Sequence, residues 1–306
     1  MADYSYIGSG KVYLRRVGDA APLRFVGNVS ALQFSVTEDV KELKDYTKPG
    51  GGTYNEVRRV QSVEASMTLH DLSPENLATA LFGNASAIAA GAAPNENHAL
   101  YRGGLVKLEA PVDSTVTPVV TLVATPDTRA NSSPVLLNDL LVPAVANGFY
   151  YRVTTAGTTD AAPPTFPTTV GATVNDGTAV LTCMGRVALT ANSDFLITGS
   201  GIEITADAAV TDGQVYEVAF TRLGSDVVEA LLNASQEYEV VFDGLNEARS
   251  GKSVSVHVFR QKLGAAQNVP FIGDEYAALE LTGKLLKDTT RNGTSESQYF
   301  QVQLVA

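Results

Sequence analysis

The sequence predicts a mostly β protein built from many short strands. Several segments alternate apolar and polar residues with a period of two, which is the pattern of a sheet with one buried face. Asn-Gly and Asp-Gly pairs, which favour tight hairpin turns, separate strand-like segments. Hydrophobic residues make up 44% of the 306 residues and charged residues 18%, so the chain can bury a core and charge-driven disorder is excluded.

Five segments in the outer parts of the chain show the alternation clearly: residues 63–69, 238–242, 254–258, 279–281 and 300–304. Each places Val, Ala, Met, Leu, Tyr or Phe on one face and mostly Glu, Ser, Thr, Gln or His on the other. These strands are therefore expected to share one apolar face and one polar, mildly acidic face.

One helix is predicted directly after the first of these strands. Ser73 can cap it, Pro74 fits its first position, Glu75 suits its positive end and Gly83 can terminate it. Its apolar residues share one side and are expected to pack on the sheet: Leu77, Leu81 and Phe82. Residues 225–231 are predicted with less support as a second short helix.

A change of composition indicates two domains. All nine lysines lie outside residues 111–222, and eight of the thirteen prolines lie between residues 111 and 167. The simplest layout is a discontinuous β domain, residues 1–110 plus 223–306, with residues 111–222 inserted as a second module. A tandem arrangement of two domains is the competing layout.

The inserted module has strand signals of its own, at residues 119–123, 149–154, 179–183, 195–198, 201–205 and 215–221. The turns between them contain Asn147-Gly148, Asp176-Gly177 and Asp212-Gly213. This pattern predicts a small, immunoglobulin-like β-sandwich.

Charge and motifs exclude several classes of function. The formal charge of -11 argues against a surface that grips nucleic acid, and no apolar stretch approaches the roughly 20 residues of a membrane helix. Cys183 is the single cysteine, and the first residues have no secretion-signal pattern, so synthesis in a cytoplasm is expected. Residues 8–11, Gly-Ser-Gly-Lys, lack the other parts of a phosphate-binding loop.

The three histidines lie in unrelated segments, so we expect no metal site: His70, His98 and His257. The sequence has no nucleophile-elbow or kinase signature, so we expect no cofactor and no enzymatic activity.

The charged, glycine-tipped segment 38–59 is longer than a hairpin connection needs. One interpretation is a mobile surface loop. The other is an arm that docks on a neighbouring subunit, with alternating charges that set register and partner choice.

The chain resembles the major tail (tail tube) proteins of long-tailed, non-contractile bacteriophages. The resemblance rests on residues 8–14, Gly27-Asn28-Val29, the loop 44–54, and the run from Val63 to Phe82 with its Ser-Pro-Glu-Asn-Leu. It continues through residues 228–235, 242–246 and 254–258 to the closing hairpin, residues 281–305, whereas residues about 126–186 depart from shorter members.

The resemblance implies a tail-tube-type β-sandwich or barrel with one packed helix, which forms stacked, usually six-fold rings. The implied partners are copies of the chain, the tape measure protein, the tail terminator and distal tail proteins, and passing DNA that is not bound. The implied location is the virion, after assembly in the host cytoplasm.

Two sets of site residues follow from that implied architecture. The loop expected to reach the adjacent ring comprises Asp45, Tyr46, Thr47, Lys48, Pro49, Gly50, Gly51, Gly52, Thr53 and Tyr54. The polar strand face expected to line the lumen comprises Glu64, Ser66, Thr68, Glu237, Glu239, Glu280, Thr282, Gln301 and Gln303. A solvated outer face of the sheet is the alternative for this second set.

The inserted module is expected to face outward. Core packing is the favoured role of Tyr150, Tyr151 and Phe166, and a platform that binds host surface glycans is the alternative. The rival functions are a β-sandwich adhesin or carbohydrate-binding surface protein, and the secreted tube of a bacterial injection system.

Overall fold

The computed structural model describes residues 4–305. The chain forms two compact units, one of Met1–Ser86 with Asp226–Ala306 (unit 1) and one of Ala87–Ser225 (unit 2). Unit 2 is thus inserted in unit 1. Its boundaries differ from the predicted 111–222, because strands before residue 111 pair with strands near its other end. The described residues are mostly β, with a single α-helix.

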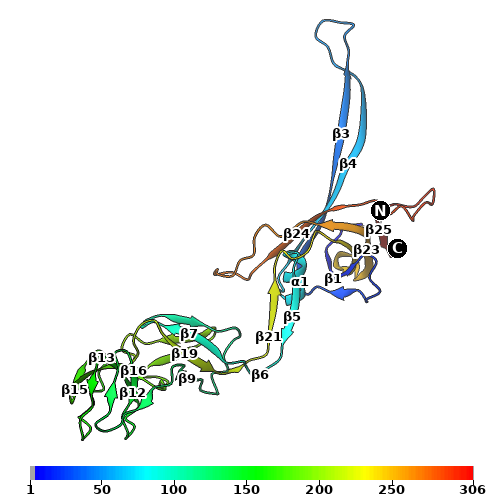
Figure 1. The fold of residues 1–306 in the computed structure, drawn as a ribbon. Helices are drawn as coiled ribbons and strands as arrows, with labels where there is room; N and C mark the ends of the chain where they lie inside the picture. Colours follow the sequence, from blue (N-terminus) through cyan, green and yellow to red (C-terminus); the bar gives the residue numbers. More distant parts are fainter. Residues whose placement is uncertain (1–3, 306) are drawn as a thin grey trace. The chain divides into compact units, whose positions relative to one another are not determined.

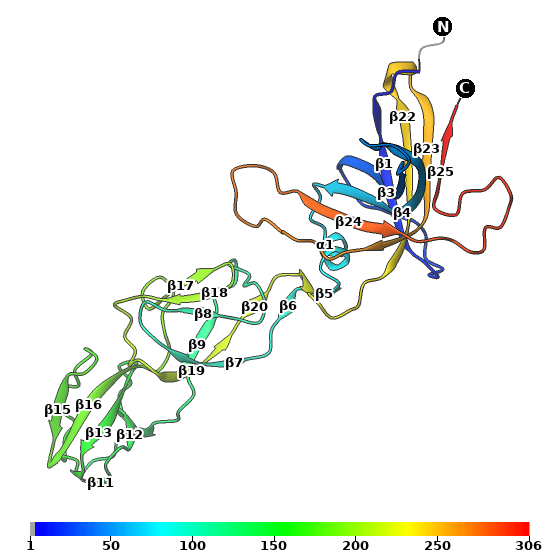
Figure 2. The same ribbon diagram turned by 90° about the horizontal axis from the view of Figure 1, so that it is seen from above.

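Unit 1 is built around one eight-stranded sheet with the order β2-β1-β22-β23-β24-β4-β3, in which β25 pairs with β23 (Figures 1 and 2). Its elements are β1 Gly8–Arg16, β2 Arg24–Phe25, β3 Val29–Lys44, β4 Thr53–Leu69, α1 Pro74–Ala80, β22 Glu237–Asn246, the 3-10 turn η1 Glu247–Arg249, β23 Lys252–Leu263, β24 Leu279–Leu285 and β25 Phe300–Leu304.

The predicted alternation is confirmed in β4. Val63, Ala65, Met67 and Leu69 are buried, and the residues between them are only partly buried. The buried face continues on the paired strands, since Leu281 of β24 lies opposite Met67. The resulting core also includes these side chains of β1, β22, β23 and β24: Val12, Leu14, Val240, Val258, Leu263, Leu279 and Leu285.

The predicted helix forms, but a different face of it is buried. Ser73 caps α1 by accepting a hydrogen bond from the Asn76 amide, as predicted. The buried residues are Asn76 and Ala80, because the Asn76 side chain donates hydrogen bonds to the carbonyl oxygens of Val26 and Asp71. The helix ends at Ala80, so the predicted apolar stripe does not form.

Residues 225–231 do not form the predicted second helix. Instead, β21 Ser225–Glu229 pairs with β5 Asn84–Ile88 in a two-stranded sheet. The adjacent β-branched residues Val227 and Val228 favour an extended backbone, and pairing with β5 satisfies the backbone hydrogen bonds of this segment.

Unit 2 consists of several short sheets, with the orders β10-β12-β13-β16-β15, β17-β18-β8, β7-β19-β9, β11-β14 and β20-β6. Its strands are β6 Gly91–Ala92, β7 Glu96–Leu100, β8 Leu105–Lys107, β9 Val119–Leu122, β10 Asp127–Thr128, β11 Pro134–Val135, β12 Leu140–Val142, β13 Phe149–Thr155, β14 Gly157–Thr158, β15 Thr173–Asp176, β16 Ala179–Arg186, β17 Phe195–Thr198, β18 Gly201–Ile204, β19 Gln214–Ala219 and β20 Thr221–Arg222. All six segments predicted as strands in this module are confirmed.

Two hydrophobic clusters stabilise unit 2, and β13 contributes to both. Tyr150 packs in the larger cluster, while Phe149, Tyr151 and Val153 pack in the smaller one. Neighbouring side chains of a strand point to opposite faces, so Tyr150 enters one cluster and Tyr151 the other. Unit 2 is a β module with two hydrophobic clusters. Its strands β10 and β12 pair in parallel.

Candidate functional site

The segment predicted as a long loop is a β-hairpin arm. β3 and β4 stay paired from Val29 with Leu69 to Lys44 with Thr53, and only residues 45–52 form the turn. Thr53 and Tyr54, predicted to lie in the inter-ring loop, are the first residues of β4. Figure 1 shows the two strands extending together beyond the rest of the unit 1 sheet.

The arm, defined as residues 35–61, has no core of its own. Apart from the partly buried Asp45, every residue in it is exposed. Apolar side chains occur on both of its faces, with Val40 opposite Arg58 and Leu43 opposite Asn55. An isolated two-stranded hairpin is marginally stable in water, so the arm has the properties of a segment that is completed by contact with another surface.

The tip of the arm is ordered by local hydrogen bonds. The Asp45 amide donates to the Gly52 carbonyl at 2.7 Å, and the Asp45 carboxylate accepts from the Thr47 hydroxyl at 2.6 Å and from its amide at 2.8 Å. These bonds from Thr47 lower the pKa of the Asp45 carboxyl. Gly50 and Gly51 adopt positive φ of 105° and 41°, a backbone region that side chains other than glycine rarely enter.

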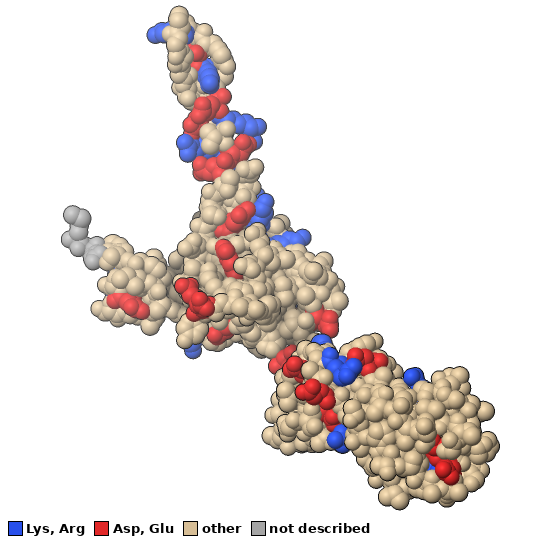
Figure 3. All heavy atoms as spheres, turned by 90° about the vertical axis from the view of Figure 1, so that its left-hand side faces the viewer, with Lys and Arg blue, Asp and Glu red and all other residues tan. Residues whose placement is uncertain are grey.

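Charges of both signs cover the arm. Five acidic and five basic residues occur between residues 37 and 62, so its formal charge is zero. Arg58 contacts the carboxylates of both Glu56 and Glu38, and Figure 3 shows red and blue side chains interspersed along the arm. Such mixed charge favours a partner of complementary pattern over a uniformly charged polymer.

The residues predicted to line a lumen all lie on the outer face of the unit 1 sheet, opposite the core. Glu280 pairs with Thr68 and Thr282 with Ser66 across β24 and β4. On the other strands, the same face carries Glu64, Glu237, Glu239, Gln301 and Gln303. The sheet thus brings these distant parts of the sequence onto one continuous surface.

This face is not acidic, contrary to the prediction. Glu239 forms an ion pair with Arg15 at 2.5 Å and a hydrogen bond with His257 at 2.7 Å, and Glu237 pairs with Arg260 at 2.7 Å. Five acidic and five basic residues project from the face, which gives a formal charge of zero: Glu64, Glu237, Glu239, Asp243 and Glu280 against Lys11, Arg15, Arg260, Lys262 and Lys284. The face is polar and charge-balanced.

Part of this balance is visible in the sequence. Lys11 and Arg15 alternate with the buried Val12 and Leu14, so period-two patterning predicts both on the polar face. Arg260 is different, because a bulge opposite Glu239 changes the alternation of β23 before that residue. No local pattern indicates that bulge.

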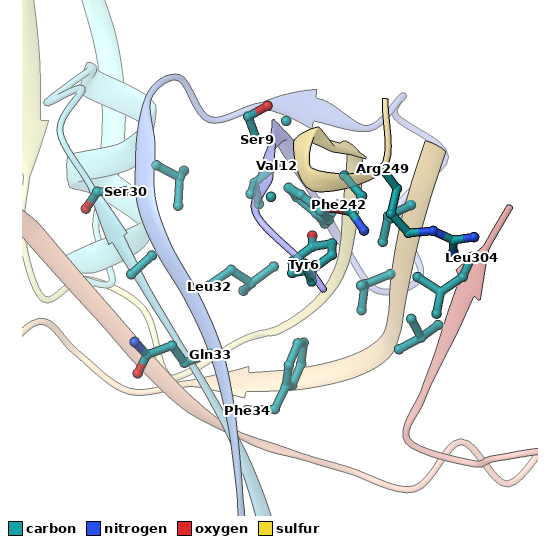
Figure 4. Close-up of a pocket in the computed structure, with 18 of the residues that line it drawn as sticks. Tyr6, Ser9, Val12, Ser30, Leu32, Gln33, Phe34, Phe242, Arg249 and Leu304 are labelled. Carbon is teal, nitrogen blue, oxygen red and sulfur yellow. The ribbon is translucent and has the colours of Figure 1, made fainter. Parts of the chain in front are cut away.

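The apolar side of β25 remains uncovered and lines a groove in unit 1. Val302 and Leu304 are 48% and 62% exposed although they alternate like core residues. The groove has a volume of about 640 Å³ and lies between β3 and the strands β1, β22, β23 and β25. Figure 4 shows Leu32 and Phe34 on its β3 side and Leu304 on the opposite side. Sequence reasoning missed this groove, since it depends on β25 pairing with only one end of β23.

Several other candidate sites take on structural roles. Residues 8–11 lie within β1 and do not form a loop. Tyr150 and Tyr151 are completely buried, and the Tyr151 ring lies 4.8 Å from that of Phe166, so core packing, the favoured interpretation of these residues, is confirmed over the glycan platform. Among residues 4–305 no group of His, Cys, Asp and Glu is arranged to hold a metal ion. In the same range, no helix has the length and hydropathy needed to cross a bilayer.

A family model matches residues 5–139 and 156–303, which is most of the chain and includes both units. The chain belongs to the family described as protein of unknown function UCP028589. No curated protein matches the chain. The match includes the arm, the polar face and all of the groove lining except Tyr4 and Leu304, so these three features lie largely within the region that defines this family.

Proposed function

We propose that the chain is a structural virion protein, the tail tube subunit of a long-tailed, non-contractile bacteriophage. In this proposal it assembles in the host cytoplasm into stacked, six-fold rings. The tube encloses the tape measure protein, ends on terminator and distal tail proteins, and later conducts DNA. The resemblance of the sequence to that family motivates the proposal.

The observation that carries the proposal is the arm. A paired, exposed ribbon without a core has no role in stabilising its own subunit, but it can reach an adjacent ring and be buried there. The unit 1 sheet also ends in free edges, since β2 and β3 each have one strand neighbour among the described residues. Pairing of such edges in a closed ring would remove the aggregation hazard that they present.

The charge-balanced sheet face supports a conduit for DNA. DNA carries one negative charge per about 1.7 Å, so a basic lining would retain it by counterion release. A lining whose acids and bases pair with each other offers no such attraction. The hydroxyl and amide groups of Ser66, Thr282, Gln301 and Gln303 make the rest of this surface polar and hydrated, without a net charge that would bind DNA.

Imaging of the purified protein tests the proposal directly. We expect size-exclusion chromatography with light scattering to detect oligomers, and negative-stain electron microscopy to show rings or tubes. A protein that stays monomeric at high concentration and over a range of salt would contradict the proposal. The adhesin alternative predicts such a monomer, and the burial of Tyr150 and Tyr151 removes the platform proposed for its ligand.

Adding positive charge to the sheet face is expected to make the tube bind and retain DNA. The substitutions Thr282→Lys, Gln301→Lys and Gln303→Lys change exposed side chains and break no ion pair. We expect tubes of this triple variant to retain DNA at low salt and to release it as salt rises, because phosphate contacts release counterions. Fluorescence anisotropy with labelled DNA measures the effect.

The matched control places three lysines on unit 2, at Leu136, Leu137 and Val145, which are 70%, 58% and 86% exposed. Tubes of the control should retain little DNA in their interior. Equal retention by both variants would exclude the assignment of this sheet face to the lumen.

A further inference from the structure

The connection between β23 and β24, residues 264–278, presents large apolar side chains to solvent. Phe271 is 79% exposed, Ile272 98% and Tyr276 96%. Single exposed apolar residues are common, but three within six positions form a patch of the kind found at interaction sites.

The base of this loop is anchored to unit 1, whereas Phe271 and Ile272 are exposed. The Ala266 amide donates a hydrogen bond of 2.8 Å to the Ala80 carbonyl, and Val269 packs against the unit 1 core. Among the residues that the structure describes, none forms a backbone hydrogen bond with residues 270–278 outside the regular elements. Proline at position 270 also restricts the backbone directly before Phe271. The apolar tip is therefore presented by a fixed base.

The groove between β3 and β25 is large and apolar enough to accommodate the apolar side chains of this loop. Its volume of about 640 Å³ is roughly four times that of a cavity of about 150 Å³ that holds benzene. Most of its lining is apolar, including Leu32, Phe34, Phe242, Val254 and Val256. Such a groove can accommodate several large side chains.

Charge complementarity indicates the occupant. Arg249 is the single charged residue in the groove lining, and its guanidinium lies 5.0 Å from the Tyr4 ring without an acidic partner among the described residues. The loop carries Asp274 and Glu275 directly after its apolar tip and has no basic residue. Figure 4 shows Arg249 on the same side of the groove as Leu304.

We propose that Phe271 and Ile272 of one copy insert into the groove of a second copy, where Asp274 and Glu275 meet Arg249. The loop and β25 lie on opposite sides of unit 1 in both ribbon views (Figures 1 and 2). A contact between two different surfaces is head-to-tail, which generates closed rings or helical filaments. This inference rests on the proposed function and identifies a contact within its ring.

Cross-linking tests the contact. We introduce Ile272→Cys and Leu304→Cys together and treat the assembled protein with a short bis-maleimide. Cys183 is buried and contributes little background. The expected result is a ladder of covalent oligomers on denaturing gels, whereas the control pair Ile272→Cys with Val145→Cys gives none.

Charge reversal provides a second readout. Arg249→Glu and, separately, Glu275→Arg are each expected to weaken association at least about tenfold, and the double reversal is expected to restore it. Phe271→Asp should weaken association without rescue. Phe271 and Glu275 are exposed, and Arg249 is partly buried without an ion-pair partner in the part of the chain that the structure describes. Circular dichroism and thermal unfolding of the monomers should therefore be unchanged, which separates loss of contact from loss of fold.

The outcomes separate the two proposals. If wild-type protein forms rings, but the 272/304 pair gives no ladder and Arg249→Glu assembles normally, the contact is overturned and the tail tube proposal stands. If the 272/304 ladder forms while no rings or tubes appear, the contact stands and the tail tube proposal fails. A monomeric protein without cross-links overturns both.

Discussion

Replacement of residues 38–61 by an Asn-Gly turn is expected to leave the subunit folded and to abolish tube formation. Thr37 and Ser62 face each other across the ladder, so a two-residue turn can close the shortened hairpin there. The core residues of β3 and β4 all lie on the retained side, from Val63 to Leu69 and from Val29 to Phe34. The deletion therefore removes no buried apolar contact.

The expected measurements are an unchanged thermal unfolding transition of the subunit and the absence of long tubes in electron micrographs. A shorter deletion, residues 49–52, keeps the paired stem and removes only the glycine-tipped turn. If the tip makes the inter-ring contact, both deletions block stacking, and single rings persist. Long tubes formed by the arm-less variant would show that the arm has no part in assembly.

Removal of the guanidinium of Arg129 is expected to cost about 3–5 kcal/mol of the stability of unit 2. Arg129 and Asp176 form a bidentate ion pair, with both nitrogen–oxygen distances at 2.7 Å, and both side chains are almost completely buried. Arg129→Leu leaves the Asp176 carboxylate buried without its counter-charge. The double variant Arg129→Leu, Asp176→Leu should recover much of the loss, because no unpaired charge remains.

The same pair makes the stability of unit 2 dependent on pH. Burial opposes the charged form of Asp176, but hydrogen bonds from Arg129 and from the Asp160 amide prevail and lower its pKa. An unfolded aspartate has a pKa of about 3.9. The folded pKa lies below that value, so the stabilisation is complete above the unfolded pKa and is lost as pH falls through the folded pKa.

Denaturant unfolding at neutral pH and at acidic pH checks both statements. In wild-type protein, unit 2 should lose stability on acidification, and the Arg129→Leu, Asp176→Leu variant should lose less. The surface pair Arg102 with Asp212 in the same unit is the matched control, since both of its side chains are exposed and Arg102→Leu should change stability little. Equal effects of Arg129→Leu and Arg102→Leu would show that the buried pair adds nothing.

Much of the local structure could be predicted because it depends on neighbours in the sequence. The alternation in β4 follows from side chains that point to opposite faces of a strand, and the Ser73 cap requires only a hydroxyl three residues before an amide. The arm was recognised as an unusual segment, but its strands were missed. Cross-strand pairing to Lys44 extends the ladder far past the last core residue, and no apolar alternation marks that extension.

The candidate site depended on contacts between distant parts of the chain, and here prediction was weaker. Glu239 could be placed on a polar strand face, yet its partners Arg15 and His257 come from two other strands. Judged from single strands, the face has an excess of acidic residues, but its formal charge is zero once the basic residues of the neighbouring strands are included. The exposed loop tip at Phe271 and the groove at Leu304 were also missed, because burial depends on which elements cover a strand.

The sequence by itself determined the β class, most strand positions, the helix cap and the presence of an exceptional segment at residues 38–59. Those features arise from backbone geometry and side-chain alternation over a few residues, which any local pattern records. The tertiary structure alone decided that the exceptional segment is a paired ribbon, that the polar face is charge-balanced, and that one apolar side of β25 stays open. These properties result from strand register and from sheet branching at β23, and both depend on pairing between residues far apart in the chain.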